Sequence, residues 1–150
     1  MSLTLRAVAV LLVPTLGCAS TLYLTVAGAS SRPGGDVFDC ARSQLPGLGF
    51  TEDSRDLRRQ RVTAHRYDWE RRLSDTRFRR MVDRLVVEVA ETAAAGSHLR
   101  VEAHSFAQLA TQRGPTEFEQ SASPVVRGAA QALRDACAAE ATGIPQTPQP

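Results

Sequence analysis

The clearest alternation of apolar and polar positions lies in the middle of the chain, in the segments on either side of a turn at residues 95–97. The apolar positions of these segments are Leu85, Val87 and Val89, followed by Leu99, Val101 and Ala103. A period of two is typical of strands with one buried face and one face in water. The sequence therefore predicts a β-hairpin whose second strand continues toward Leu109.

Shorter alternating segments predict further strands. These segments are residues 21–26, 48–53 and 61–67. Residues 69–81 have neither clean helical nor clean strand spacing, so an irregular connector is expected there. Residues 112–115 contain a Gly-Pro pair that breaks the alternation, and Phe118 is therefore expected in a polar loop.

Two segments carry apolar residues at helical spacing instead. The first runs from about residue 36 to 45, with Asp36 as the expected N-cap, and it ends at Pro46. The second runs from about residue 124 to 141, with Ser123 as the N-cap and Pro124 in the first helical position. Its expected inner face consists of Val126, Ala129, Ala130, Leu133 and Cys137.

These elements predict an α+β fold with an antiparallel sheet of four to five strands. Both helices, 36–45 and 124–141, are expected to pack on one face of the sheet and to leave the other face open. The 150 residues allow one domain. We assign residues 1–17 to a signal or anchor segment, 18–142 to the domain, and 143–150 to a disordered proline-rich tail.

An uncharged apolar run follows Arg6 and ends at Gly17, directly before Cys18. A positive start, a short apolar core and small residues are typical of a bacterial export signal. The Gly17–Cys18 junction resembles the lipobox of envelope lipoproteins, which covers only the first twenty or so residues of this chain. The resemblance implies that Cys18 is lipidated, becomes the new N-terminus and anchors the domain to a membrane, facing the periplasm.

The same residues are compatible with other ways of processing the N-terminal segment. Ordinary signal peptidase could cleave after Ala19 or after Ala29, since both follow small residues at the recognition positions. The segment could also stay uncleaved as a membrane helix, because no charge occurs between Arg6 and Arg32.

Cys40 and Cys137 form an even pair in a chain with the pattern of an export signal, and we predict a disulfide between them. Closing a loop of nearly a hundred residues should stabilise the fold by about 4 kcal/mol. The alternative is two buried free thiols. A metal site is disfavoured because the sequence has no C-x-x-C motif.

All 18 basic residues are arginine, and they are unevenly distributed. Residues 55–84 contain eleven arginines and five acids. Arginines interleaved with aromatic residues can bind phosphate-rich or acidic surfaces. The candidate binding residues are Arg58, Arg59, Arg61, Trp69, Arg71, Arg72, Arg77, Phe78, Arg79 and Arg80. The competing interpretation is a solvated face with internal salt bridges.

The sequence shows no sign of catalysis or of a cofactor. It contains no G-x-S-x-G elbow, no P-loop and no G-x-G-x-x-G motif. His98 and His104 are six residues apart on one strand face, too far to share a metal without a bend. An enzyme would need His65 within reach of one of them, together with a carboxylate.

We therefore expect a non-enzymatic, membrane-tethered envelope lipoprotein with no cofactor and no metal. It would act as an accessory or structural subunit of a membrane-associated assembly. Its partners would be the membrane, through a lipid or a helix, and a protein, but not nucleic acid. The alternative is a binder or carrier of an anionic ligand, such as lipid or lipopolysaccharide, through the Arg55–Arg84 segment. The exposed sheet face, with Glu88, His98, Arg100 and Glu102, is a second candidate contact surface.

Overall fold

The computed structural model describes residues 22–93 and 96–138 and confirms the α+β class. The strands are β1 (Leu24–Ser30), β2 (Thr51–Asp56), β3 (Arg61–Asp68), β4 (Phe78–Glu91), β5 (Ser97–Thr111) and β6 (Gly114–Gln120). The helices are α1 (Gly34–Gln44), α2 (Pro124–Ala138) and a short 3-10 turn at Pro46–Leu48. Cys18, the segment 1–17 and the tail 143–150 lie outside the described residues.

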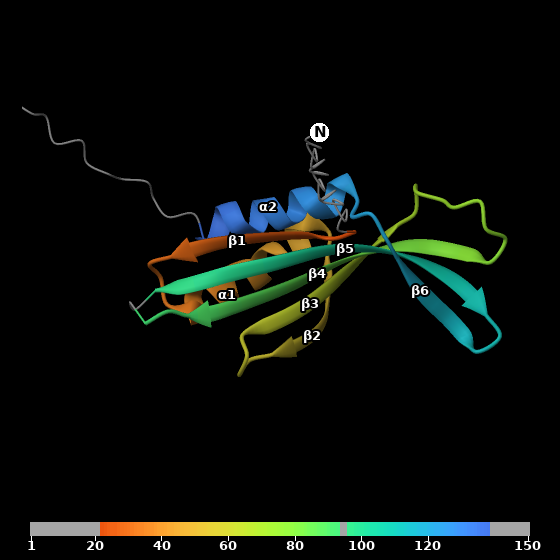
Figure 1. Ribbon diagram of the computed structural model, residues 1–150. Helices are drawn as coiled ribbons and strands as arrows, with labels where there is room; N and C mark the ends of the chain where they lie inside the picture. Colours follow the sequence, from red (N-terminus) through yellow and green to blue (C-terminus); the bar gives the residue numbers. More distant parts are fainter. Residues whose placement is uncertain (1–21, 94–95, 139–150) are drawn as a thin grey trace, which may run out of the picture.

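All the strands pair antiparallel in the order β1-β5-β4-β3-β2. Strand β6 pairs with the second half of β5, on the same edge that pairs with β1 in the first half. The two strands therefore follow one another along that edge of β5 (Figure 1). The long strand β5 of the β4–β5 hairpin therefore pairs with β1 in its first half and with β6 in its second half.

Both helices cover one face of the sheet, as the sequence predicts (Figure 1). The apolar positions of the hairpin face them, and Leu85, Val87, Leu99 and Val101 are completely buried. Helix α2 lies so close to β1 that a side chain on Gly28 would approach the Cβ of Ala138 to 3.0 Å. We call this region, in which α1 and α2 cover the sheet, the helix-covered half.

The far end of the hairpin projects beyond the helices (Figure 1). We call this region, residues 69–82 and 106–120, the arm. It comprises the β3–β4 loop, the first residues of β4, the last residues of β5 and all of β6. Phe118 on β6 is 49% exposed, whereas Met81 and Ala107 are fully buried. The arm thus buries a few side chains of β4 and β5, whereas β6 stays largely exposed.

A buried polar cluster joins the two regions at the start of α2. The carboxylate of Asp83 accepts hydrogen bonds from the hydroxyls of Ser105 and Ser123. The hydroxyl of Ser123 in turn accepts from the amide of Val126 at 3.1 Å and so caps α2 as predicted. A carboxylate at a helix N-terminus is favourable because the free amides and the helix dipole are positive there.

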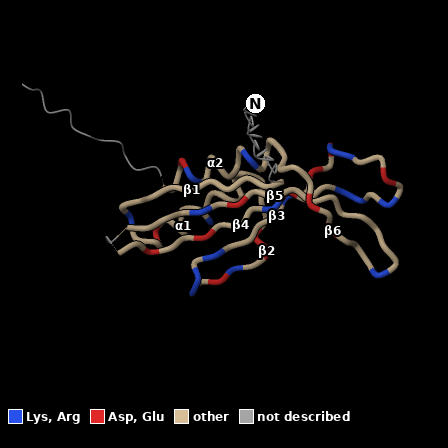
Figure 2. Tube along the Cα trace, in the orientation of Figure 1, with Lys and Arg blue, Asp and Glu red and all other residues tan. Residues whose placement is uncertain are grey.

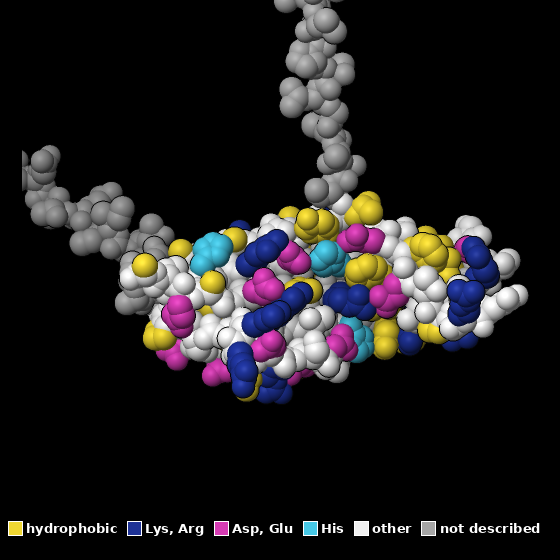
Figure 3. Space-filling model, turned by 60° about the horizontal axis from the view of Figure 1, so that its bottom comes forward, with side chains coloured by type: hydrophobic (Ala, Val, Ile, Leu, Met, Phe, Trp, Pro, Cys, Tyr) yellow, Lys and Arg dark blue, Asp and Glu magenta, His cyan; other side chains and the backbone are white. Residues whose placement is uncertain are grey.

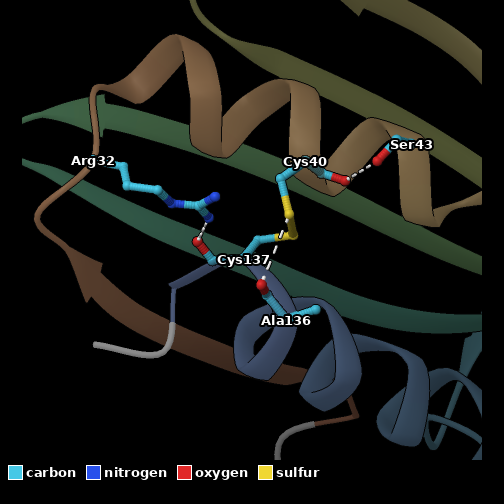
Figure 4. The surroundings of a disulfide bond; sticks show 5 residues. All are labelled: Arg32, Cys40, Ser43, Ala136 and Cys137. Atoms are coloured by element: carbon cyan, nitrogen blue, oxygen red, sulfur yellow. Dashed lines mark hydrogen bonds between the residues drawn. A yellow bond between two sulfur atoms is a disulfide. The ribbon is translucent and has the colours of Figure 1, made fainter. Parts of the chain in front are cut away.

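The Cys40–Cys137 disulfide joins α1 to α2 (Figure 4). The two Cα atoms are 5.8 Å apart, within the normal range. The guanidinium of Arg32 donates to the carbonyl of Cys137, and the hydroxyl of Ser43 donates to the carbonyl of Cys40. The pairing predicted from the sequence is therefore present, and it fixes the two helices to each other above the sheet.

Several predicted boundaries were wrong. The first strand begins at Leu24 rather than 21 and extends to Ser30, because every residue from Leu24 to Ser30 pairs with β5. The segment predicted as strand 48–53 begins at the end of a 3-10 turn. Gly49, which has a positive φ, terminates this turn, and β2 therefore covers Thr51–Asp56.

Three further predictions need correction. Asp36 lies in the first turn of α1 and does not cap it; the amide of Gly34 donates to the Glu91 carboxylate instead, at 2.8 Å. The connector after Trp69 ends at Arg77, and Phe78 already begins β4. The expected loop around Phe118 is strand β6, because pairing with β5 outweighs its polar composition.

Candidate functional site

The sheet face opposite the helices carries aromatic, basic and acidic side chains in register. We call it the open face; Figure 3 looks onto it and shows the three histidines among alternating basic and acidic groups. Pairing places His65, Arg84 and His104 in one row across β3, β4 and β5. The adjacent row contains Tyr67 and Phe106 on either side of Val82. The alternation of each strand directs these side chains away from the core.

Arginines stack on the aromatic rings of this face. The guanidinium carbon of Arg80 lies 4.0 Å from the ring centroid of Tyr67, and that of Arg84 lies 4.7 Å from the ring of Phe106. Each pair is attractive by about 0.5–1 kcal/mol at an exposed site, since the cation meets the negative face of the ring. Arg80 also donates to the amide oxygen of Gln108 at 2.8 Å.

The rings continue toward the edge strands. Tyr23 stacks on His104 with the centroids 4.9 Å apart, and His104 lies 5.9 Å from Phe106. On the other side, Tyr67 lies 4.8 Å from His65 and 5.6 Å from Trp69. We call the eight residues of these stacks the open-face network. They are Tyr23, His65, Tyr67, Trp69, Arg80, Arg84, His104 and Phe106.

Carboxylates pair with the charged members of the network. The Nδ1 atom of His104 is 2.7 Å from Glu119 on β6, and Arg84 contacts both oxygens of Glu117 at 3.2 and 3.0 Å. On the opposite edge, Nδ1 of His65 pairs with Asp53. Exposed pairs of this kind contribute little stability, but they hold the rings and guanidinium groups in one arrangement.

The Arg-rich candidate segment is divided between two ends of the sheet (Figure 2). Arg58 and Arg59 lie in the β2–β3 turn and Arg61 begins β3. The remaining candidates lie at the other end of β3, in the β3–β4 loop or at the start of β4. They are Trp69, Arg71, Arg72, Arg77, Phe78, Arg79 and Arg80. An eight-residue strand spans about 25 Å, so the segment does not form one continuous patch.

Several of these arginines pair with nearby acids. Arg61 contacts Glu88 across the β3–β4 pair at 3.2 Å. Arg77 donates to Asp75 at 2.9 and 3.2 Å, and this lowers the pKa of the Asp75 carboxyl below its ordinary value. Trp69 and Arg80 belong to the open-face network, so the structure brings these two sequence candidates together.

The second candidate surface predicted from the sequence lies on the open face. A hollow of about 370 Å³ there is lined by Arg59, Glu88, Val89, Ala90, His98 and Arg100. A larger hollow of about 710 Å³ lies on the arm and is lined by Arg77, Ala110, Thr111, Gln112 and Arg113. Both open widely to solvent, and Val89 is the one core residue among the side chains that line them.

The histidines are too widely spaced to share one reacting atom. His65 and His104 lie two strands apart, about 10 Å, with Arg84 between them. Across residues 22–93 and 96–138, no three His, Cys, Asp or Glu side chains are grouped as a metal site would need. In this part of the chain, His65 and His104 each pair with a carboxylate of their own, and the two pairs do not meet at a common centre.

Sequence reasoning did not identify most of the open-face network. Tyr67, Arg84, His104 and Phe106 were placed on strands but were not grouped, because the register between strands is not visible in one sequence. Tyr23 and the acids of β6 were missed because their strands were misplaced or assigned to a loop. The alternation of His104 and Phe106 along β5 was the available signal.

No family model matches the chain, and a search of the curated proteins finds no similar sequence. Among the described helices, none combines the length and the apolar character needed to cross a membrane.

Proposed function

We propose that this protein is a membrane-tethered envelope lipoprotein and acts as a non-enzymatic accessory subunit of a membrane-associated assembly. Its domain would bind a protein partner through the open face. The lipid anchor at Cys18 is inferred from the export-signal pattern and the Gly17–Cys18 junction. The contact surface is inferred from the geometry of the described residues.

The open-face network is the observation that carries the proposal. Tyr, Trp and Arg are the residue types that contribute most binding energy at protein interfaces. Here they are already held by stacking and ion pairs, with Arg80 on Tyr67 and Arg84 on Phe106. Side chains that are ordered before binding lose less conformational entropy on association. A partner with matching acidic and apolar groups would complete the surface.

Within residues 22–93 and 96–138, no second layer covers this face. Arg100 is about half exposed, and His104 and Glu102 are partly exposed. A row of partly exposed rings between charged groups resembles the composition of a non-obligate interface, in which an apolar centre is surrounded by a polar rim. This composition favours a face that binds another protein over a face that is buried between two layers of the fold.

Photo-crosslinking in the intact cell envelope tests the contact surface. A benzophenone amino acid would replace Arg100 on the open face or, as the matched control, Asp39 on the exposed side of α1. We expect a discrete adduct of higher mass from position 100 and none from position 39. Adding Phe106→Ala should reduce the adduct from position 100 at least threefold. Equal crosslinking from both positions would contradict an open-face contact.

A second candidate function is binding of an anionic ligand by the arm. The Nη1 atom of Arg71 is buried and has no hydrogen-bond partner within the described residues. The arm hollow is lined by Arg77 and Arg113. An arginine with an unused donor suits a phosphate or carboxylate, which accepts paired hydrogen bonds. Titration of the purified protein with inorganic phosphate, with Arg71→Gln as the comparison, tests this function by the shift in melting temperature.

A further inference from the structure

Exposed apolar side chains gather where the described chain begins, around the start of α2. Leu22, Tyr23 and Val125 are 42, 40 and 44% exposed. The carbonyl of Leu22 accepts a hydrogen bond from the amide of Ala122 at 2.7 Å, and Val125 follows in the first turn of α2. Phe118 on β6 is 49% exposed and precedes Ala122 by four residues. Figure 3 shows hydrophobic side chains beside this point.

We call Leu22, Tyr23, Phe118 and Val125 the junction patch; Tyr23 also stacks on His104 and so lies where the patch meets the open-face network. They are four of the seven large hydrophobic residues that are well exposed among the described residues. The other three, Leu57, Trp69 and Leu73, lie in the β2–β3 turn and the β3–β4 loop. Apolar side chains that cluster on a surface mark contacts with proteins or membranes. The position of the patch along the chain distinguishes between these partners.

The next step rests on the proposed lipidation of Cys18. Three residues separate Cys18 from Leu22, and an extended chain spans at most about 3.6 Å per residue. The Cα of Leu22 therefore lies within about 14 Å of the Cα of a lipidated Cys18. The polar layer on each side of a bilayer is about 5–8 Å thick. A tether this short keeps the patch within reach of that layer.

We propose that the junction patch docks onto the lipid headgroup layer of the membrane that anchors Cys18. The side chains fit this environment, because Leu22, Phe118 and Val125 supply apolar area and Tyr23 has a ring with a polar end. Arg127 is exposed in the first turn of α2 and adds a positive charge for anionic headgroups. The contact sets the orientation of the whole domain.

This orientation places the β2–β3 turn far from the bilayer. Strand β2 forms the sheet edge opposite β1, and its turn to β3 lies next to Glu88, at the end of β4 away from Asp83. Leu57 at the tip of this turn is 65% exposed. It thus provides an exposed leucine at the sheet edge opposite the patch, which makes it a matched control.

Quenching of single tryptophans by brominated lipid tests the docking. The full chain, purified from membranes, would be reconstituted in vesicles of phosphatidylethanolamine, phosphatidylglycerol and dibrominated phosphatidylcholine. Each variant carries Trp69→Phe plus one new tryptophan: Leu22→Trp as the tethered reference, Val125→Trp as the test, or Leu57→Trp as the control. We expect Val125→Trp to be quenched nearly as much as Leu22→Trp and at least threefold more than Leu57→Trp.

The outcomes separate docking from anchoring. If intact mass shows the acylated chain and Leu22→Trp is quenched, but Val125→Trp is quenched no more than Leu57→Trp, the domain is tethered without docking and the inference is wrong. If the mass shows no acyl group and none of the tryptophans is quenched, the proposed lipidation fails and the docking fails with it.

Discussion

The helix-covered half and the arm share the long hairpin β4–β5, but different side chains hold each region together. In the helix-covered half, Leu85 and Leu99 are completely buried beneath two helices joined by a disulfide. In the arm, Phe118 stays half exposed. Near its base, the rings of Tyr67 and Phe106 are covered by arginines instead. One alternating pattern therefore gives a core where helices cover the sheet and, where they do not, a partly exposed face whose rings are covered by arginines.

The largest difference between the two regions should appear on removing a large side chain. Leu99→Ala leaves a cavity in the core and should lower the free energy of unfolding by about 2–5 kcal/mol. Leu57→Ala removes the same atoms from an exposed turn and should change it by less than about 0.5 kcal/mol. Urea denaturation followed by circular dichroism measures both. Similar losses from the two variants would mean that the packing described for Leu99 is wrong.

Loss of the disulfide should come next. Replacing Cys40 and Cys137 by serine together removes a link between residues 97 apart in sequence. The chain-entropy model gives a loss of about 4 kcal/mol, because the unfolded chain regains its freedom. Comparing the urea midpoints of the oxidised wild-type protein and the double variant measures the loss. Identical midpoints would show that the bridge does not constrain the purified chain.

The polar cluster at the junction of the two regions should have an intermediate effect. Ser123→Ala removes the cap of α2 and one donor to Asp83, so the free energy of unfolding should fall by about 1–2 kcal/mol. Ser121→Ala, in the exposed linker before α2, is the matched control and should be neutral. Thermal melts of the two variants give the comparison. If Ser123→Ala melts at the same temperature as the wild-type protein, the polar cluster does not stabilise the fold.

The open face should respond in the opposite way, with a small stability change and a large binding change. Phe106→Ala removes the ring beneath Arg84 and should cost only about 0.5–1 kcal/mol of stability. It should nevertheless weaken the crosslink from position 100 at least threefold, as described above. A stability loss as large as that of Leu99→Ala would make Phe106 a core residue and weaken the interface proposal.

The smallest effect should come from the exposed pair on the arm. Because Arg77 lowers the pKa of Asp75, the ionised carboxylate favours the folded state, and this contribution is lost as the pH falls through the lowered pKa. Asp75→Asn should remove that part of the pH dependence and change the melting temperature little near pH 7. Melting curves between pH 2 and 7 measure this, and a steeper acid response in the variant would contradict the assigned direction.

The sequence predicted the helix-covered half better than the arm, for a physical reason. Residues such as Leu85, Leu99 and Val126 alternate or recur because one face of their element is buried, and burial leaves a periodic pattern. Cys40 and Cys137 could be paired because they were the even pair after Cys18. These features depend on local spacing, which a single sequence shows.

The arm and the open-face network could not be predicted in the same way. Strand β6 begins with Gly114 and Pro115 and carries mostly polar residues, so its pairing with β5 leaves no apolar period. The contacts of Arg84 with Phe106 and Glu117 join separate strands, and they depend on the register rather than on spacing along the chain. The Arg-rich segment looked continuous in sequence, but β3 separates its two ends.

The central claim is that a disulfide-linked domain is held at a membrane by a lipidated Cys18. Intact mass of the chain extracted from membranes, before and after reduction, tests it most directly. The account predicts a chain that begins at Cys18 with added acyl mass and gains about two protons when the Cys40–Cys137 bond is reduced. A membrane-extracted chain that begins at Met1, or one that begins at residue 20 or 30 without acyl mass, would contradict it.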